Sequence, residues 1–240
     1  MGASADANVN ALLAASTSTP LSESDKDDLV DMGIPESLVE LADKNPEAIP
    51  FVQDYISHGQ DTPKISLKKD LDSDRAVPLL IQWDERWGYR KYGGDFIAVT
   101  GCGPTCLSMV KTALSGSKKW NPYKVAKMAE NKGYYVEGQG SSWELMSAGA
   151  ESLGLCSNTV VFDEEHIIQE LQAGRPIICS MRPGDFTTTG HFLVLSDVTE
   201  DGKIRVNDPN SLVRSNKLWD LDRLMPQIRN LWSFDQAEEA

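Results

Sequence analysis

Basic side chains are scarce in this chain of 240 residues, which has 23 Lys and Arg against 36 Asp and Glu and a net charge of −13. Nucleic acids and anionic membrane surfaces would repel such a chain, so neither is an expected partner. The chain also lacks an apolar run close to the roughly 20 residues that a transmembrane helix needs. We therefore expect no membrane span and no nucleic-acid partner.

Cysteine is rare as well, and no two of the four cysteines have the Cys-x-x-Cys spacing. That spacing is typical of zinc ribbons and thioredoxin-like redox sites, so neither kind of site is expected. Four cysteines in 240 residues are also too few for a framework of disulfides. We expect no metal and no other cofactor. Cys156 and Cys179 lie in β-rich segments and are expected to be buried, which leaves Cys102 and Cys106 for chemistry.

An export signal begins with a basic region, and the first 20 residues have none. Asp6 also conflicts with the motif for N-myristoylation. The segment is rich in Ala, Ser, Thr and Asn, a composition that predicts a disordered tail over residues 1–20. The protein is therefore expected to be cytoplasmic, or else the sequence begins after a signal that has been removed.

Acidic residues gather in the first third of the chain, where 80 residues hold 15 Asp and Glu against 6 Lys and Arg. Residues 34–58 predict two short helices that break near Pro46 and Pro50. We expect residues 21–76 to form a helical N-terminal extension and linker. The acidic excess is expected to form a solvated surface. Two further roles remain open for the extension, because a pro-segment could cover a catalytic cleft and an accessory segment could pack on the main domain.

Residues 77–240 are expected to form the main domain. A short strand is predicted from Val77, and several helices with typical capping residues follow it. The β-rich segments come after these helices, and an Asp-Gly pair joins the last two as a hairpin. This order indicates an α+β domain with a helical part and then an antiparallel sheet. The predicted helices span residues 103–114, 121–133, 141–154 and 163–174, and the predicted strands span residues 175–181, 191–198 and 203–208.

The stretch TGCGPTCLSMVKTAL places Cys102 at the start of a predicted helix. A helix start presents unpaired N–H groups and the positive end of the helix dipole, and both stabilise a thiolate. The thiolate is the nucleophilic form of cysteine, so the backbone alone would activate a thiol here. Gly101 and Gly103 allow a sharp turn and a close approach to a substrate. Cys106 lies one turn further along the helix and is a rival nucleophile, although its position fits core packing.

A reactive thiol needs a base and a donor for the oxyanion that forms during attack on a carbonyl. His191 follows a glycine and opens an apolar strand. By contrast, His58 lies in a connector and His166 lies on a predicted helix. We therefore predict His191 as the base. Gln82 lies 20 residues before Cys102 and carries an amide that stays neutral, which makes it a candidate oxyanion donor.

The predicted hairpin supplies a candidate to orient this base. If the turn is centred one or two residues before the Asp-Gly pair, or if a strand contains a bulge, His191 faces residues 208–210. Asp208 is then a near neighbour of His191 on the adjacent strand. Two alternatives stay open: Asn207 could orient His191 instead, and an Asp before Pro also favours a plain turn.

Five segments carry a resemblance to a known family. In chain order they are QWDERWGYRKYGG, GCGPTCLSMV, LQAGRPII, GHFLVLSDV and DGKIRVNDP. Together they resemble the double-glycine (bacteriocin-processing) peptidase-like family of cysteine peptidases over roughly Pro78 to Asn210. The resemblance implies an α+β papain-like cysteine peptidase fold. It also implies the roles of four residues: Cys102 as nucleophile, His191 as general base, Asp208 as its orienter and Gln82 as oxyanion donor.

The same resemblance implies a cysteine peptidase, a thiol hydrolase that cleaves a peptide or a related amide bond in a peptide or protein substrate. An acyltransferase or transpeptidase is an alternative, because only the acceptor of the acyl group would differ. A non-catalytic peptide-binding module of the same fold is another. The resemblance favours a secreted or cell-surface protein of a Gram-positive bacterium, because the helical extension is similar to segments that precede such domains there. The sequence does not predict the oligomeric state.

Overall fold

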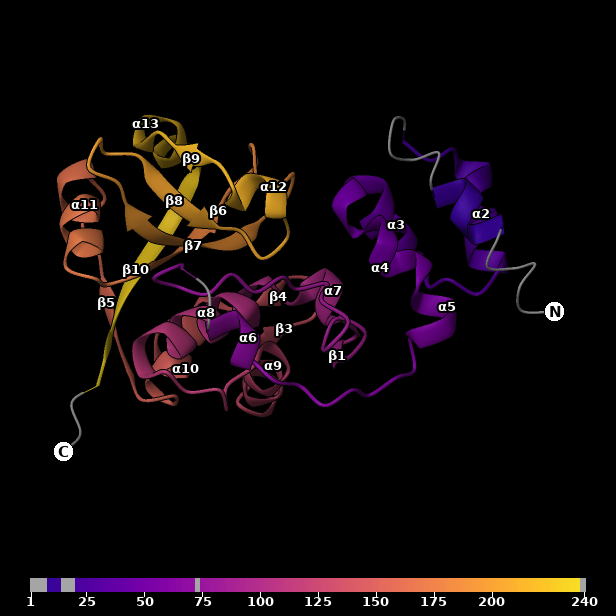
Figure 1. Ribbon diagram of the computed structural model, residues 1–240, viewed down its shortest axis with the longest axis horizontal. Coiled ribbons are helices and arrows are strands. Elements are labelled where there is room, and N and C mark those ends of the chain that lie inside the picture. The colour runs from indigo at the N-terminus through magenta and orange to yellow at the C-terminus, as the bar shows by residue number, and fades with distance from the viewer. Residues whose placement is uncertain (1–7, 14–19, 72–73, 238–240) are drawn as a thin grey trace.

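The computed structural model describes residues 8–13, 20–71 and 74–237. The chain forms three parts in succession, a helical extension, a helical layer and an antiparallel sheet (Figure 1). The sheet, orange to yellow in Figure 1, lies above the magenta helical layer, and the indigo extension lies beside both. Among the described residues, no helix is both long and apolar enough to cross a membrane.

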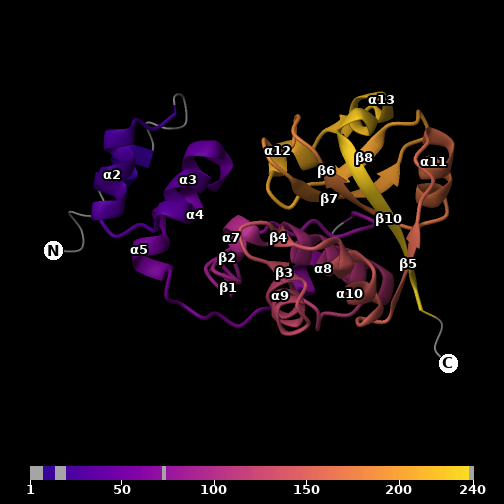
Figure 2. The ribbon, with the colours of Figure 1, turned by 180° about the vertical axis from the view of Figure 1, so that it is seen from behind.

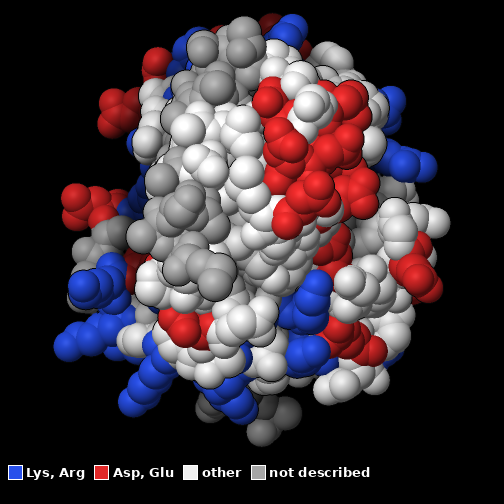
Figure 3. Space-filling view, turned by 90° about the vertical axis from the view of Figure 1, so that its right-hand side faces the viewer, with Lys and Arg blue, Asp and Glu red and all other residues white. Residues whose placement is uncertain are grey.

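The N-terminal extension consists of short helices. In chain order they are α2 (Glu23–Asp31), α3 (Glu36–Lys44), a 3-10 turn (Pro46–Ala48), α4 (Ile49–Gln53) and α5 (Tyr55–His58). Part of the predicted tail, residues 8–13, is also helical, because Val9 and Leu13 are buried in the core of the extension. Residues 1–7 and 14–19 of that predicted tail lie outside the described residues. Acidic side chains cover part of the face that the extension presents in Figure 3.

The extension shares a hydrophobic core with the main domain. Its buried side chains pack against Tyr89, Phe96 and Ala98, which belong to the main domain. The rings of Phe51 and Tyr89 stack with centroids 4.1 Å apart, and the Tyr89 hydroxyl donates to the Phe51 carbonyl oxygen at 2.6 Å. Because buried aromatic rings from the extension and from the main domain pack together here, the contact resembles the interior of a single domain. The extension is therefore packed on the main domain.

The helical layer surrounds the long helix α8 (Cys102–Ser115), which begins one residue earlier than predicted. Helix α9 (Pro122–Asn131) has the predicted cap, since the Asn121 side chain accepts the Lys124 N–H at 3.1 Å. The remaining elements of the linker and the layer are α6 (Lys68–Leu71), β1 (Lys91–Tyr92), β2 (Asp95–Phe96), α7 (Ile97–Thr100), β3 (Tyr135–Val136) and β4 (Gly140–Ser141).

The prediction of a single helix over residues 141–154 is wrong. The chain instead forms a 3-10 turn (Trp143–Met146) and the one-turn helix α10 (Ala148–Glu151). Ser147 separates them with φ −110° and ψ −94°, outside the helical region. Ser141 does not cap a helix, because it lies in β4 and its hydroxyl bonds to the Tyr92 hydroxyl at 2.8 Å.

Six antiparallel strands form the sheet, in the order β5-β10-β6-β7-β8-β9. Helix α8 packs on one face of the sheet, where it contacts β7, and α11 packs on the other face of the sheet (Figure 2). The predicted α+β class is therefore confirmed. The strands are β5 (Leu155–Thr159), β6 (Ile177–Met181), β7 (His191–Val198), β8 (Ile204–Asn207), β9 (Leu218–Trp219) and β10 (Ile228–Gln236), and the helices are α11 (Glu164–Gln172), α12 (Leu212–Ser215) and α13 (Leu221–Leu224), with a 3-10 turn (Met225–Gln227) before β10.

Two sequence predictions about the sheet region are wrong. Cys156 is exposed, because β5 is an edge strand, whereas Cys179 on β6 is buried as predicted. The segment from Val77 is not a strand, and Pro78 has no N–H to donate to a strand ladder. Side chains hold this segment instead, since the Asn207 amide donates to the Val77 carbonyl oxygen at 2.9 Å.

Candidate active site

Cys102 is the first residue of α8 and lines a pocket to which the extension, the helical layer and the sheet region all contribute. Two glycines surround it because neighbouring atoms leave no space for a side chain. A Cβ on Gly101 would lie 2.4 Å from the Ile97 carbonyl oxygen, and one on Gly103 would lie 2.5 Å from the Ser141 hydroxyl oxygen. The start of the helix is therefore packed closely on both sides, while Cys102 itself stays partly exposed.

The environment of Cys102 favours its thiolate. Burial raises the pKa of the Cys102 thiol, but a hydrogen bond and the charge of His191 lower it. The backbone N–H groups of Phe192 and Gly103 lower it further, and the combined result is a pKa below the ordinary value of a thiol. Cys106 differs, because it is fully buried in the core and burial raises its pKa well above the usual value. Cys106 therefore belongs to the core.

His191 opens β7, the strand on which α8 packs, and is 8% exposed. Its Nε2 bonds to Asp208 Oδ1 at 2.7 Å. Because Nε2 is engaged there, Nδ1 is the ring nitrogen left for the hydrogen bond with Cys102. Burial opposes the charge of the His191 imidazolium, but the Asp208 carboxylate and the Cys102 sulfur outweigh it and raise the pKa of His191. These two opposite shifts favour a thiolate–imidazolium pair.

Asp208 follows β8 and is fully buried. Strands β7 and β8 pair Val194 with Asn207, and a bulge near Ser196 shifts the register between them. The hairpin therefore brings Asp208 beside His191, within the range of registers predicted from the sequence. Burial raises the pKa of Asp208, but the charges of His191 and Arg214 lower it below its usual value.

Three groups from the loop that follows β8 hold the Asp208 backbone and carboxylate. Arg214 Nε donates to Asp208 Oδ2 at 2.6 Å, and the Asn210 N–H donates to Oδ1 at 2.8 Å. The Asp208 N–H donates to the Ser215 hydroxyl at 2.9 Å. The carboxylate therefore has donors on both oxygens, which fixes its plane toward the imidazole.

Gln82 lines the same pocket as Cys102 and is 3% exposed. Its N–H donates to the Pro209 carbonyl oxygen at 2.7 Å, which ties it to the residue after Asp208. Its side-chain nitrogen donates to the Ala98 carbonyl oxygen at 2.7 Å and lies 3.4 Å from the Val99 carbonyl oxygen. The side-chain nitrogen therefore has one short hydrogen bond and one long contact.

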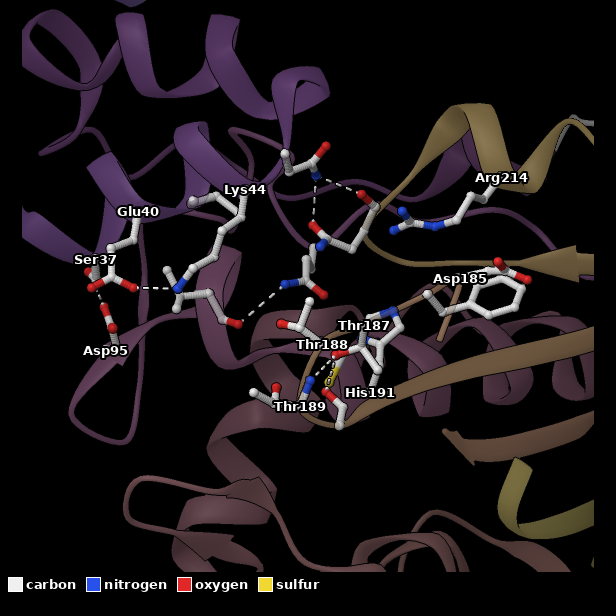
Figure 4. A pocket seen from close by; sticks show the side chains of 18 of the residues that line it. Ser37, Glu40, Lys44, Asp95, Asp185, Thr187, Thr188, Thr189, His191 and Arg214 are labelled. Atoms are coloured by element: carbon white, nitrogen blue, oxygen red, sulfur yellow. Dashed lines mark hydrogen bonds and ion pairs between the residues drawn. The ribbon is translucent and has the colours of Figure 1, made fainter. Parts of the chain in front are cut away.

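The pocket has a volume of about 850 Å³ and contains both Cys102 and His191 among its lining residues. Figure 4 shows that His191 lies between two groups of side chains. Ser37, Glu40 and Lys44 of α3 lie on one side, and Arg214 and Asp185 lie on the other. The N-terminal extension therefore forms a wall of the pocket and leaves the pocket open.

The structure brings together the four predicted site residues: Cys102, His191, Asp208 and Gln82. Asn207 does not orient the imidazole, because its amide bonds to Val77 and accepts from Arg75 at 2.9 Å. His58 and His166 are exposed and bond to nearby aspartates.

Sequence reasoning missed Arg214 and the pocket residues of α3. No motif or spacing marks these residues, because their role depends on how distant segments pack.

These features define a class of protein: an α+β papain-like domain with a cysteine at a helix start and a histidine–aspartate pair on the adjoining sheet. Comparison with protein families gives a match to the Peptidase_C39 like family over residues 75–237. The chain belongs to this family, and the predicted papain-like fold is confirmed. Membership in the family suggests cysteine peptidase activity. None of the curated proteins compared with the chain matches it.

Proposed function

We propose that the protein is a cysteine peptidase that cleaves peptide bonds through Cys102, His191 and Asp208. The observation that carries the proposal is the arrangement of Cys102 and His191 in the lining of one open pocket, with His191 bonded to the buried Asp208. This set contains a nucleophile, a base and a group that orients the base, which is what thiol hydrolysis requires.

Acylation uses the thiolate and the imidazolium as a pair. The Cys102 thiolate attacks the carbonyl carbon of the scissile bond, and a C–S bond forms while the carbonyl oxygen gains negative charge. His191 then gives its proton to the leaving nitrogen as the C–N bond breaks. In the second half, His191 takes a proton from water, the water oxygen attacks the acyl carbon, and the C–S bond breaks to restore the thiolate.

The oxyanion would be held by two neutral donors. Gln82 has a second amide hydrogen whose contact with the Val99 carbonyl oxygen is long, at 3.4 Å, so this hydrogen is available to an anion. The Cys102 N–H lies at the start of α8, where backbone N–H groups have no helical partner. Donors of this kind stabilise the transition state because they already point at the place where charge develops.

A peptide library tests this proposal. The wild type and Cys102→Ala are incubated with the library, and products are identified by mass spectrometry. Cys156→Ser is a matched control because Cys156 is exposed on an edge strand. We expect cleavage by the wild type and the control and none by Cys102→Ala. Equal patterns for all three proteins would contradict the proposal.

The same experiment distinguishes the alternatives. With an added amine acceptor, an acyltransferase or transpeptidase would give ligated products in place of hydrolysed ones, because the acceptor competes with water for the acyl group. A non-catalytic peptide-binding module would bind library peptides and leave all of them intact.

We also propose that the protein acts outside a bacterial cell or at its surface. The support is the similarity of the extension to segments that precede such domains in Gram-positive bacteria. Fractionation of native cells with an antibody to the protein tests it. Detection of the protein in the cytoplasm alone would contradict it.

A further inference from the structure

The turn between α3 and α4 contacts the loop that carries Asp208. Glu47, in the 3-10 turn after α3, accepts hydrogen bonds from the Ser211 hydroxyl, the Leu212 N–H at 2.8 Å and the Val213 N–H at 3.0 Å. Asn45 is 8% exposed, and its amide donates to the Asn210 carbonyl oxygen at 2.8 Å. Two neighbouring side chains of the extension therefore bind four consecutive residues after Pro209.

The bound segment also holds the catalytic carboxylate. Asn210 and Arg214 donate to the two oxygens of Asp208, and Ser215 accepts the Asp208 N–H. A continuous series of contacts thus leads from Glu47 through residues 210–215 to Asp208 and on to His191. Each step in it is a hydrogen bond or an ion pair between described residues.

The extension has a fixed position from which to hold this loop. Its core includes Tyr89 and Phe96 of the main domain, and Ser37 on α3 donates to Asp95 Oδ1 at 2.8 Å. Both the buried core and these polar contacts therefore attach the extension to the main domain on either side in sequence of the turn that carries Glu47. Packed interiors transmit small displacements because they contain little free space.

We propose that Asn45 and Glu47 are positioning residues of the active site, which makes the N-terminal extension an integral part of the peptidase. The inference rests on the proposed function, because it assigns a role toward the catalytic Asp208. It also decides between the two roles that the sequence left open. A pro-segment must leave before the site can act, whereas this segment supports the geometry that the site needs.

Loss of the Glu47 carboxylate has a definite physical consequence. The N–H groups of Leu212 and Val213 and the Ser211 hydroxyl lose their acceptor, so the loop is free to shift. Asp208 and Arg214, which belongs to α12, lie in the same segment after β8, and a shift of either changes the charge beside His191. We expect the pKa of His191 to fall, because the Asp208 carboxylate is what raises it.

Glu47→Ala, Glu47→Gln and Asn45→Ala in the full-length protein test the proposal. The control is Asp43→Asn, because Asp43 stabilises the extension alone: it pairs with Lys26 at 2.9 Å and accepts the Leu21 N–H at 2.7 Å. The measurements are kcat and KM on a cleaved peptide, the pH profile, the rate of Cys102 alkylation and thermal unfolding.

We expect Glu47→Ala to lower kcat/KM by about 10- to 100-fold, mainly through kcat, and to move the basic limb of the profile to lower pH. Asn45→Ala should act in the same direction, and Glu47→Gln should retain part of the activity because its carbonyl oxygen still accepts hydrogen bonds. Asp43→Asn should lower the unfolding temperature and leave the pH profile unchanged.

Three results would overturn the proposal. The first is a Glu47→Ala protein with wild-type kcat/KM and pH profile, and the second is an equal shift of the profile in Asp43→Asn. The third is higher activity in Glu47→Ala, which would indicate a pro-segment instead. Failure of the proposed function is distinguishable: a wild type that cleaves nothing, but whose Cys102 alkylation depends on Glu47, would keep the positioning role and reject the peptidase.

Discussion

The chemistry at the scale of residues depends on two opposed pKa shifts. His191 lowers the pKa of Cys102, while Asp208 and the Cys102 sulfur raise the pKa of His191. The active pair then exists at pH values above the Cys102 pKa and below the His191 pKa. Activity should rise with pH through the first value and fall through the second, which gives a bell-shaped profile.

Asp208→Asn tests the charge that raises the His191 pKa. Without the carboxylate, the imidazolium gives up its proton at lower pH, so the basic limb of kcat/KM should move to lower pH. At neutral pH we expect kcat to fall by about 10- to 100-fold. The control is Asp197→Asn on the same hairpin, which should leave the profile in place. An unmoved basic limb in Asp208→Asn would contradict the assignment of Asp208.

Gln82→Ala tests the oxyanion donor. We expect kcat to fall by about 100-fold with a smaller change in KM, because the lost donor acts mainly in the transition state. Alkylation of Cys102 by iodoacetamide should keep its wild-type rate, since that reaction forms no oxyanion. A parallel loss of alkylation would show that Gln82 acts by supporting α7, which directly precedes α8 and contains Ala98, its hydrogen-bond partner.

The central site residues were predictable because their chemistry leaves local signals. Cys102 lies among glycines at a helix start, and His191 and Asp208 lie in segments that pair as a hairpin. Arg214 and Glu47 left no such signal. An arginine six residues after Asp208 does not by itself indicate a contact with Asp208. Glu47 is 165 residues away in sequence from Leu212, to which it bonds. Contacts of that range follow from tertiary packing alone.

At the scale of elements, α8 carries the proposed nucleophile Cys102, and it starts in a confined space. Its first turn packs against β4, and residues 103–112 are buried. The sequence predicted α8, α9 and α11 well because each has a clear periodic face and clear ends. It failed over residues 141–154, where Ser141 pairs in β4 and bonds to Tyr92. There the tertiary contact outweighs the local helical pattern.

Gly103→Ala tests the confinement of this helix start. The new Cβ would lie 2.5 Å from the Ser141 hydroxyl oxygen and 2.8 Å from the Ser141 Cβ. We expect the free energy of unfolding to fall by about 1–3 kcal/mol, with a loss of activity as Cys102 shifts. Gly94→Ala is the control, because a Cβ there has open space. Adding Ser141→Gly should restore part of the stability, and a Gly103→Ala protein as stable as the control would contradict the packing.

At the scale of the whole molecule, the extension and the main domain form one packed unit. The sequence predicted the helical character of the extension, and the family match starts at Arg75, close to the predicted boundary at residue 77. It could not predict where the extension docks. That depends on the surface formed by Tyr89, Phe96 and Ala98, which exists only once the main domain has folded.

Cleavage of the connector, the segment between α5 and α6, tests this docking. A specific protease site inserted between Asp61 and Thr62, which are both exposed, allows the chain to be cut after folding. We expect the extension to stay bound and activity to persist, because the shared core with Phe51 and Tyr89 does not depend on the connector. Size-exclusion chromatography and peptide cleavage measure both. Release of the extension with a gain in activity would identify it as a pro-segment.

The most direct test of the account is the pH dependence of Cys102 alkylation. Wild type, His191→Ala and a free thiol are treated with iodoacetamide over a range of pH, and mass spectrometry follows the labelled peptide. We predict that Cys102 in the wild type reacts well below the pH at which the free thiol reacts, and that His191→Ala loses this advantage. A wild-type Cys102 that titrates like the free thiol, or that is equally reactive without His191, would contradict the account.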